Sequence, residues 1–72
     1  MITRQYGSEQ HCFKCGNRRS THYLVMTYIL HYKDVDIICV CDKHSNYMSD
    51  HKRRGVFSTL EDAQAEALRL SL

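Results

Sequence analysis

The chain contains 72 residues, of which ten are basic and eight acidic, and its formal net charge is +2. This length fits a single domain spanning residues 1–72. So small a domain buries little apolar surface, and a metal ion, disulfides or a partner chain usually adds to its stability. The four cysteines and five histidines are therefore the first candidates for such a stabilising feature. The nearly balanced charge permits a nucleic-acid partner without requiring one.

The sequence also bears on the cellular compartment. Its longest apolar-leaning run, residues 23–32, contains Thr27 and His31 and is shorter than the roughly 20 residues of a membrane-spanning helix. The first ten residues hold no apolar run of the signal-peptide type. We therefore expect a cytoplasmic protein with no membrane partner. In a reducing compartment cysteines are more often metal ligands than disulfides, although disulfides or buried thiols stay open as alternatives.

The expected elements begin with a short strand at residues 3–6, followed by a turn-rich loop at residues 11–20. Residues 21–32 and 35–40 are rich in β-branched and aromatic residues, which favour strands. A turn at Lys33-Asp34 would join these two strands as an antiparallel hairpin.

The two faces of the first hairpin strand differ in character. Alternation along a strand sends neighbouring side chains to opposite faces, and the more apolar face is expected to meet the core. That face carries Leu24, Met26, Tyr28, Leu30 and Tyr32, and the other carries Tyr23, Val25, Thr27, Ile29 and His31. Val25 and Ile29 indicate partial cover of this second face.

The C-terminal third predicts a short helix within residues 41–52, a break at Arg53-Arg54-Gly55 and a short strand at Val56-Phe57. The last segment predicts an amphipathic α-helix. Its first turn follows a capping-box pattern, and its apolar residues recur at the spacing of one helix face. The capping candidates are Ser58 or Thr59 with Glu61 and Asp62, and the buried stripe is Leu60, Ala63, Ala67 and Leu70.

Two ligand pairs predict one structural zinc ion. Cys12-Phe13-Lys14-Cys15-Gly16 and Cys41-Asp42-Lys43-His44 each leave a two-residue gap, which lets both side chains of a pair reach one centre. Because a hairpin starts and ends at the same end, Cys15 and Cys41 can meet. The predicted ligands are thus Cys12, Cys15, Cys41 and His44.

Two other residues are alternative ligands. Cys39 lies two positions before Cys41, so in a regular strand both side chains would share a face and a set with four cysteines would form. His11 lies next to Cys12. We prefer His44 because its two-residue gap from Cys41 repeats the spacing of the first pair.

These residues resemble the treble-clef zinc fingers, in which a zinc knuckle, a β-hairpin and a ligand pair opening a helix follow one another. They are also similar to the paired motifs of small bacterial zinc-finger domains found in stress-response adaptors. The resemblance covers a zinc-binding core at residues 10–51 and leaves residues 55–72 as a strand-helix extension. It implies an α+β fold. Treble clefs include nucleic-acid binders, protein adaptors and parts of nucleases, so the resemblance leaves the function open.

A closed four-ligand site leaves no position for a reacting water, so we expect no enzyme activity. The preferred function is a protein-interaction adaptor or an inhibitor of a larger assembly. Its contact face would carry Tyr23, Val25 and Ile29, which would dock a partner or a second copy of the chain.

Nucleic-acid binding is the alternative function. Basic side chains flank the knuckle and follow the second ligand pair, where they would contact phosphates, and tyrosines would stack on bases. The basic candidates are Lys14, Arg18, Arg19, Lys52, Arg53 and Arg54. A metal-dependent nuclease is less favoured, because no recognisable motif joins its candidate residues, which are His22, His31, His51, Asp34, Asp36 and Asp50.

Overall fold

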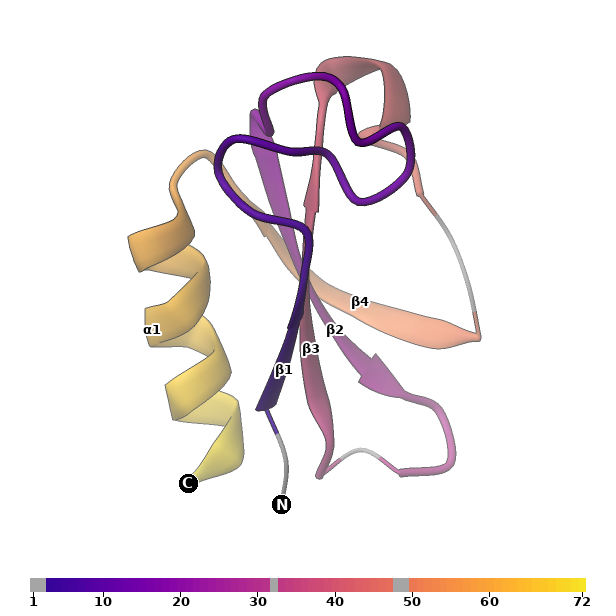
Figure 1. Cartoon of the computed structure of the whole chain (residues 1–72). Coiled ribbons are helices and arrows are strands. Elements are labelled where there is room, and N and C mark those ends of the chain that lie inside the picture. The colour runs from indigo at the N-terminus through magenta and orange to yellow at the C-terminus, as the bar shows by residue number, and fades with distance from the viewer. Residues whose placement is uncertain (1–2, 32, 48–49) are drawn as a thin grey trace.

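A four-stranded mixed sheet carries one α-helix on one face. The other face carries the loop of residues 7–21, which holds Cys12 and Cys15 and is called the cysteine loop (Figure 1). The computed structural model describes residues 3–31, 33–47 and 50–72. The sheet order is β1-β3-β2-β4, with β1 parallel to β3 and the other pairs antiparallel. The fold is α+β, as predicted. Its elements are β1 (Thr3–Tyr6), β2 (His22–Tyr28), β3 (Val35–Val40), the 3₁₀ helix η1 (Asp42–His44), β4 (His51–Phe57) and α1 (Leu60–Ser71).

Both faces of the two central strands are buried, so the second face, for which partial cover was predicted, is as much a core face as the first. Tyr23 and Val25, which the alternation placed on the less apolar face, are 5% and 0% exposed and lie under α1 with Ala63 and Ala67. The opposite face packs under the cysteine loop; its buried members are Leu24, Met26, Ile38, Val40, Cys12 and Cys41. The alternation of one strand cannot show that a distant helix covers its second face.

The hairpin strand ends earlier than predicted. β2 stops at Tyr28, and Ile29 and Leu30 lie beyond it with 67% and 85% of their surface exposed. Leu30 is therefore not a core residue. Tyr32, which was also placed on the core face, lies outside the described residues.

The fourth strand begins earlier than predicted. β4 starts at His51 and runs through the expected break at residues 53–55. Its pairing with β2 shifts between Val25 and Met26, where Gly55 opposes Val25 and Arg53 opposes Met26. One extra residue, Arg54, is thus accommodated as a β-bulge. An edge strand tolerates such a bulge and its charged side chains.

The two helical predictions fared differently. The expected short helix is the three-residue η1. The terminal helix is confirmed: Thr59 is the N-cap and its side chain accepts a hydrogen bond from the Asp62 amide at 3.2 Å. The predicted stripe faces the sheet, with Ala63 and Ala67 buried and Leu60 and Leu70 packed beside them.

Gly7 anchors the start of the cysteine loop in a conformation that favours glycine. Its φ is +79°, and an added Cβ would lie 2.9 Å from the His11 carbonyl oxygen and 3.0 Å from the Cys39 carbonyl oxygen.

Replacing Gly7 with alanine is therefore expected to lower the free energy of unfolding by about 1–3 kcal/mol. Urea unfolding measures this loss. Gly16 also has positive φ but open space around it, so Gly16→Ala should cost less, and an equal cost would contradict the steric argument.

Candidate metal centre

Four donor atoms converge where the cysteine loop meets the end of β3. The ligand atoms of Cys12, Cys15, Cys41 and His44 all lie within 4.8 Å of one another. Cys12 and Cys15 come from the loop between β1 and β2, Cys41 directly follows β3, and His44 ends η1. The antiparallel pairing of β2 with β3 returns the chain to the same end of the sheet, where the second pair meets the first.

The spacing within the set fits a tetrahedral ion. With a zinc–sulfur distance of about 2.3 Å and a zinc–nitrogen distance of about 2.0 Å, two sulfurs lie about 3.8 Å apart and sulfur and nitrogen about 3.5 Å apart. The Sγ atoms of Cys15 and Cys41 are 3.9 Å apart. His44 Nδ1 lies 3.6 Å from Cys12 Sγ and 3.3 Å from Cys41 Sγ. Three thiols and an imidazole are also donors that zinc prefers.

Two tight turns hold these side chains in place. The Gly16 amide donates to the Cys12 carbonyl at 2.8 Å, and Gly16 has a φ of +73°, which glycine adopts readily. The Lys14 amide points at Cys12 Sγ at 3.4 Å. In the second pair the His44 amide donates to the Cys41 carbonyl at 3.0 Å. Each pair is thus set by backbone hydrogen bonds within its own turn.

The loop is also tied to the sheet. The Phe13 amide donates to the Cys39 carbonyl at 2.7 Å, and the Thr21 amide donates to the Val40 carbonyl at 2.9 Å. Phe13 makes edge-to-face contacts with Tyr6 and Tyr47, at ring-centroid distances of 5.3 and 5.8 Å. These contacts place the first ligand pair over the end of β3.

Local electrostatics favours a thiolate at Cys12. Burial raises the pKa of Cys12, but hydrogen bonds from backbone amides of Cys15, Cys41 and Lys14 outweigh it and bring the pKa to about 6. Burial raises the pKa of Cys41, and the neighbouring thiols add to that rise, while the His44 amide opposes it. A cation bound at the centre would stabilise the thiolates together, because coordinated thiols lose their protons.

The alternative ligands lie elsewhere. Cys39 is fully buried on the opposite face of the sheet, under α1 with Tyr23. Burial, helped by the charge of Glu9, raises its pKa to about 11. β3 ends at Val40, so the regular alternation that would pair Cys39 with Cys41 stops before the ligand position. His11 Nδ1 instead lies 3.0 Å from the Gly16 carbonyl oxygen.

This arrangement predicts that Cys39 is dispensable for metal binding. Cys39→Ala is expected to keep one zinc per chain, because the change removes a core sulfur and leaves the four-donor set intact. Elemental analysis of the purified variant measures the zinc content. A variant that folds yet loses zinc would return Cys39 to the ligand set.

Two of the predicted basic residues, Lys14 and Arg53, contact Tyr47. Lys14 Nζ lies 4.9 Å from the centroid of the Tyr47 ring, and Arg53 Nη2 donates to the Tyr47 carbonyl at 3.0 Å. Sequence reasoning missed Lys43, which lines the same hollow as Lys14; its only signal was its place beside His44. Of the other basic candidates, Arg54 donates to Thr27 Oγ1, and Arg18, Arg19 and Lys52 are exposed.

A second polar cluster lies on the loop face of the sheet. Asp36 is fully buried, and its two oxygens meet Arg4 Nε at 3.1 Å and His51 Nε2 at 2.7 Å. The Tyr28 ring packs at a tilt against His51, with ring centroids 4.1 Å apart, and lies under the Arg4 guanidinium. The cluster joins β1, β3, β2 and β4. Each carboxylate oxygen already has a partner, so the cluster is a structural crosslink in this arrangement.

The residues considered for a nuclease do not form a second ligand group. Within residues 3–31, 33–47 and 50–72, the set of three cysteines and His44 is the group that meets metal-ligand spacing. His51 pairs with Asp36, and His22 Nδ1 lies 2.8 Å from Thr21 Oγ1.

Comparison of the chain with protein-family models, curated proteins and solved structures found no match. The interpretation of this site therefore rests on its own geometry. In the part of the chain that the structure describes, every helix is too short or too polar to cross a membrane.

Proposed function

We propose that this chain is a non-catalytic protein with one structural zinc ion, held by Cys12, Cys15, Cys41 and His44. The convergence of these four donors at tetrahedral spacing carries the proposal. Four protein ligands fill a tetrahedral zinc ion and leave no position for substrate or reacting water. The ion joins the loop to the end of β3 and gives a small domain the additional stability that its core does not supply.

The same proposal gives the folded module a role in binding another protein, as an adaptor or an inhibitor. The contact face first considered is unsuitable, because Tyr23 and Val25 lie under α1. Other apolar side chains support the role. Ile29 and Leu30 project at the hairpin tip, beside a hollow of about 420 Å³, and Leu68 on α1 is 62% exposed. Exposed apolar groups of this kind mark contact surfaces when they cluster.

A selection experiment tests the protein-binding role. Zinc-loaded protein is used to select from a displayed library of random twelve-residue peptides, and the metal-free protein serves as the control. Peptides that bind the zinc-loaded protein alone, and shift discrete backbone resonances, would support the role. A selection that yields no peptide specific to the zinc-loaded form would contradict it.

Single-stranded nucleic acid is the second candidate, and one observation favours it. Lys14 Nζ lies over the Tyr47 ring, Lys43 lines the hollow beside that ring, and Arg53 donates to the Tyr47 carbonyl oxygen. Such a ring can stack on an unpaired base while the cations contact phosphates. Lys14→Glu with Lys43→Glu should then weaken the binding of a fluorescent single-stranded oligonucleotide at least about tenfold. The matched change of Arg18 and Arg19 to glutamate should have a smaller effect, and equal effects would contradict a site at Tyr47.

A further inference from the structure

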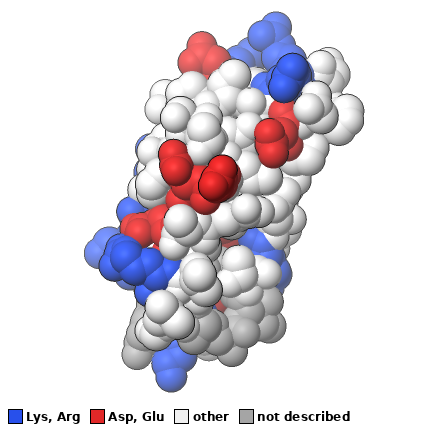
Figure 2. All heavy atoms as spheres, turned by 90° about the vertical axis from the view of Figure 1, so that its left-hand side faces the viewer, with Lys and Arg blue, Asp and Glu red and all other residues white. Residues whose placement is uncertain are grey.

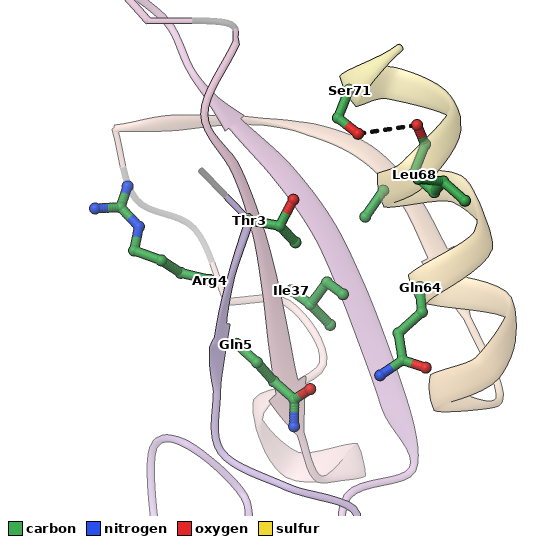
Figure 3. Close-up of a pocket in the computed structure, with 8 residues that line it drawn as sticks. Thr3, Arg4, Gln5, Ile37, Gln64, Leu68 and Ser71 are labelled. Carbon is green, nitrogen blue, oxygen red and sulfur yellow. Dashed lines mark hydrogen bonds between the residues drawn. The ribbon is translucent and has the colours of Figure 1, made fainter. Parts of the chain in front are cut away.

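A groove separates the outer strand β1 from α1 (Figure 3). Thr3 and Gln5 lie on the β1 side, Gln64 reaches from α1, and Ile37 lies between the strand and the helix. The groove has a volume of about 310 Å³. It exists because α1 packs on β2, β3 and β4, so the helix-facing side of β1 stays uncovered and Thr3 and Gln5 are exposed.

The edge of the sheet beside this groove can accept another strand. β1 is the first strand in the sheet order and pairs with β3 on one side. An edge strand presents a row of backbone N–H and C=O groups that an extended segment can pair with, at a spacing of about 4.8 Å. The chemistry of this edge therefore specifies an occupant in the extended conformation.

The two edges of the sheet differ in how they are protected. β4, the opposite edge, carries Lys52 and Arg54 and contains the bulge. Charged side chains and bulges are devices that keep an edge from pairing with another chain. On β1 the charged residue is Arg4, which lines the groove but turns its side chain away from α1, and its Nε donates to Asp36. β1 is the less protected edge.

Two side chains at the groove have unused hydrogen-bonding capacity. Within the described residues, the Thr3 hydroxyl and the Gln64 amide make no hydrogen bond, whereas the Gln5 amide donates to the Gly7 carbonyl at 3.2 Å. Ala67 and Ile37 supply an apolar floor. β1 is four residues long and offers few backbone bonds. An added strand would therefore also need side-chain contacts in this groove.

The charge beside the groove indicates the partner's composition. α1 carries Glu61, Asp62 and Glu66 but one basic residue, Arg69, which pairs with Glu66. Figure 2 looks onto this side of the molecule and shows acidic side chains gathered across its middle. A segment that approaches along β1 would pass the acidic side chains of α1, of which Glu61 and Asp62 have no basic partner on the helix, and this favours lysine and arginine in the partner.

We propose that the β1 edge binds an extended, basic segment of a partner protein, which adds to the sheet as a fifth strand and places an apolar side chain in the groove. This inference rests on the proposed protein-binding function and names its site and its partner class. A second copy of the chain fits less well. Antiparallel pairing of β1 with its own copy would place two acidic α1 helices on the same face of one continuous sheet, where like charges disfavour the pairing.

The test uses zinc-loaded, isotope-labelled full chain and a ten-residue peptide probe. The probe alternates lysine with valine or leucine and contains no proline. Binding is expected to protect β1 amides from hydrogen exchange and to shift the Gln64 side-chain resonance. Two N-methylated versions carry methyl groups at alternate residues, one on each edge of the extended peptide. One version should bind at least about tenfold more weakly than the other, because only one edge faces β1.

A matched pair of variants tests the groove itself. Gln64→Lys adds a cation at the groove and should weaken peptide binding roughly tenfold. Ala65→Lys adds the same charge at an exposed position of the same helix that does not line the groove, and should change binding less. Equal effects of both variants, or equal binding of both N-methylated peptides, would overturn strand addition at β1.

The outcomes separate this inference from the proposed function. Library-selected peptides that bind but shift resonances at the hairpin tip would keep the protein-binding role and overturn the β1 site. A concentration-dependent dimer that protects the same β1 amides without peptide would overturn the partner assignment in favour of a second copy. An oligonucleotide that shifts Tyr47, with no binding by any peptide, would overturn both in favour of nucleic acid.

Discussion

Replacing Cys41 with serine is expected to abolish stoichiometric zinc binding and to unfold the chain. Serine keeps the size of the side chain but removes a thiolate, which zinc prefers to a hydroxyl. Structural zinc contributes about 10–16 kcal/mol of apparent binding free energy in finger peptides, whereas a whole domain is stable by about 5–15 kcal/mol. Losing most of that binding free energy would remove more stability than the core of a 72-residue domain provides. Elemental analysis and far-ultraviolet circular dichroism measure the two losses.

The control for this experiment is the fourth cysteine. Cys39→Ala also removes a buried thiol close in sequence, but from the opposite face of the sheet. It should retain zinc and most of its circular dichroism signal. If Cys41→Ser instead kept one zinc per chain with unchanged stability, Cys41 would not be a ligand.

Replacing Asp36 with asparagine is expected to lower the free energy of unfolding by about 3 kcal/mol. The carboxylate is fully buried and bonds Arg4 from β1 and His51 from β4. Asparagine removes the charge and leaves these partners with a neutral amide in a site that excludes water. Because the Arg4 side chain is 37% exposed, its guanidinium can recover some hydration, which places the expected cost at the low end for a buried pair. Urea unfolding of the zinc-loaded protein measures the change.

Asp34→Asn is the matched control for Asp36→Asn. It removes the same charge two residues earlier, before β3 begins, and should change stability by no more than about 0.5 kcal/mol. A second variant, Arg4→Met, completes a double-mutant cycle with Asp36→Asn. If the losses in unfolding free energy of the two single variants simply added up in the double variant, Arg4 and Asp36 would not be a coupled pair between β1 and β3.

Local signals made the candidate metal site and the last helix predictable. The two-residue gaps of both ligand pairs, with a strand-turn-strand pattern between them, already indicated that Cys15 and Cys41 can meet. The cap at Thr59 and the stripe through Ala63 and Ala67 are likewise set by residues three or four apart. Such features depend on the spacing of residues that are close in the sequence, so they can be read from the sequence alone.

Long-range packing could not be predicted in the same way. Nothing near Tyr23 and Val25 shows that α1 returns to cover them. The burial of Asp36 depends on Arg4 and His51, which are distant along the chain. Strand β4 runs through Arg53-Arg54-Gly55, where local preference opposes a strand, because β2 supplies an edge to pair with. In each case a tertiary contact decides a structure that the local pattern leaves open.

If zinc holds this fold together, the metal content of the purified native chain and its circular dichroism before and after a strong chelator will show it. We expect one zinc per chain and a loss of folded signal on chelation that added zinc restores. A chain that contains no zinc and keeps its full signal in chelator would rule out a structural zinc ion.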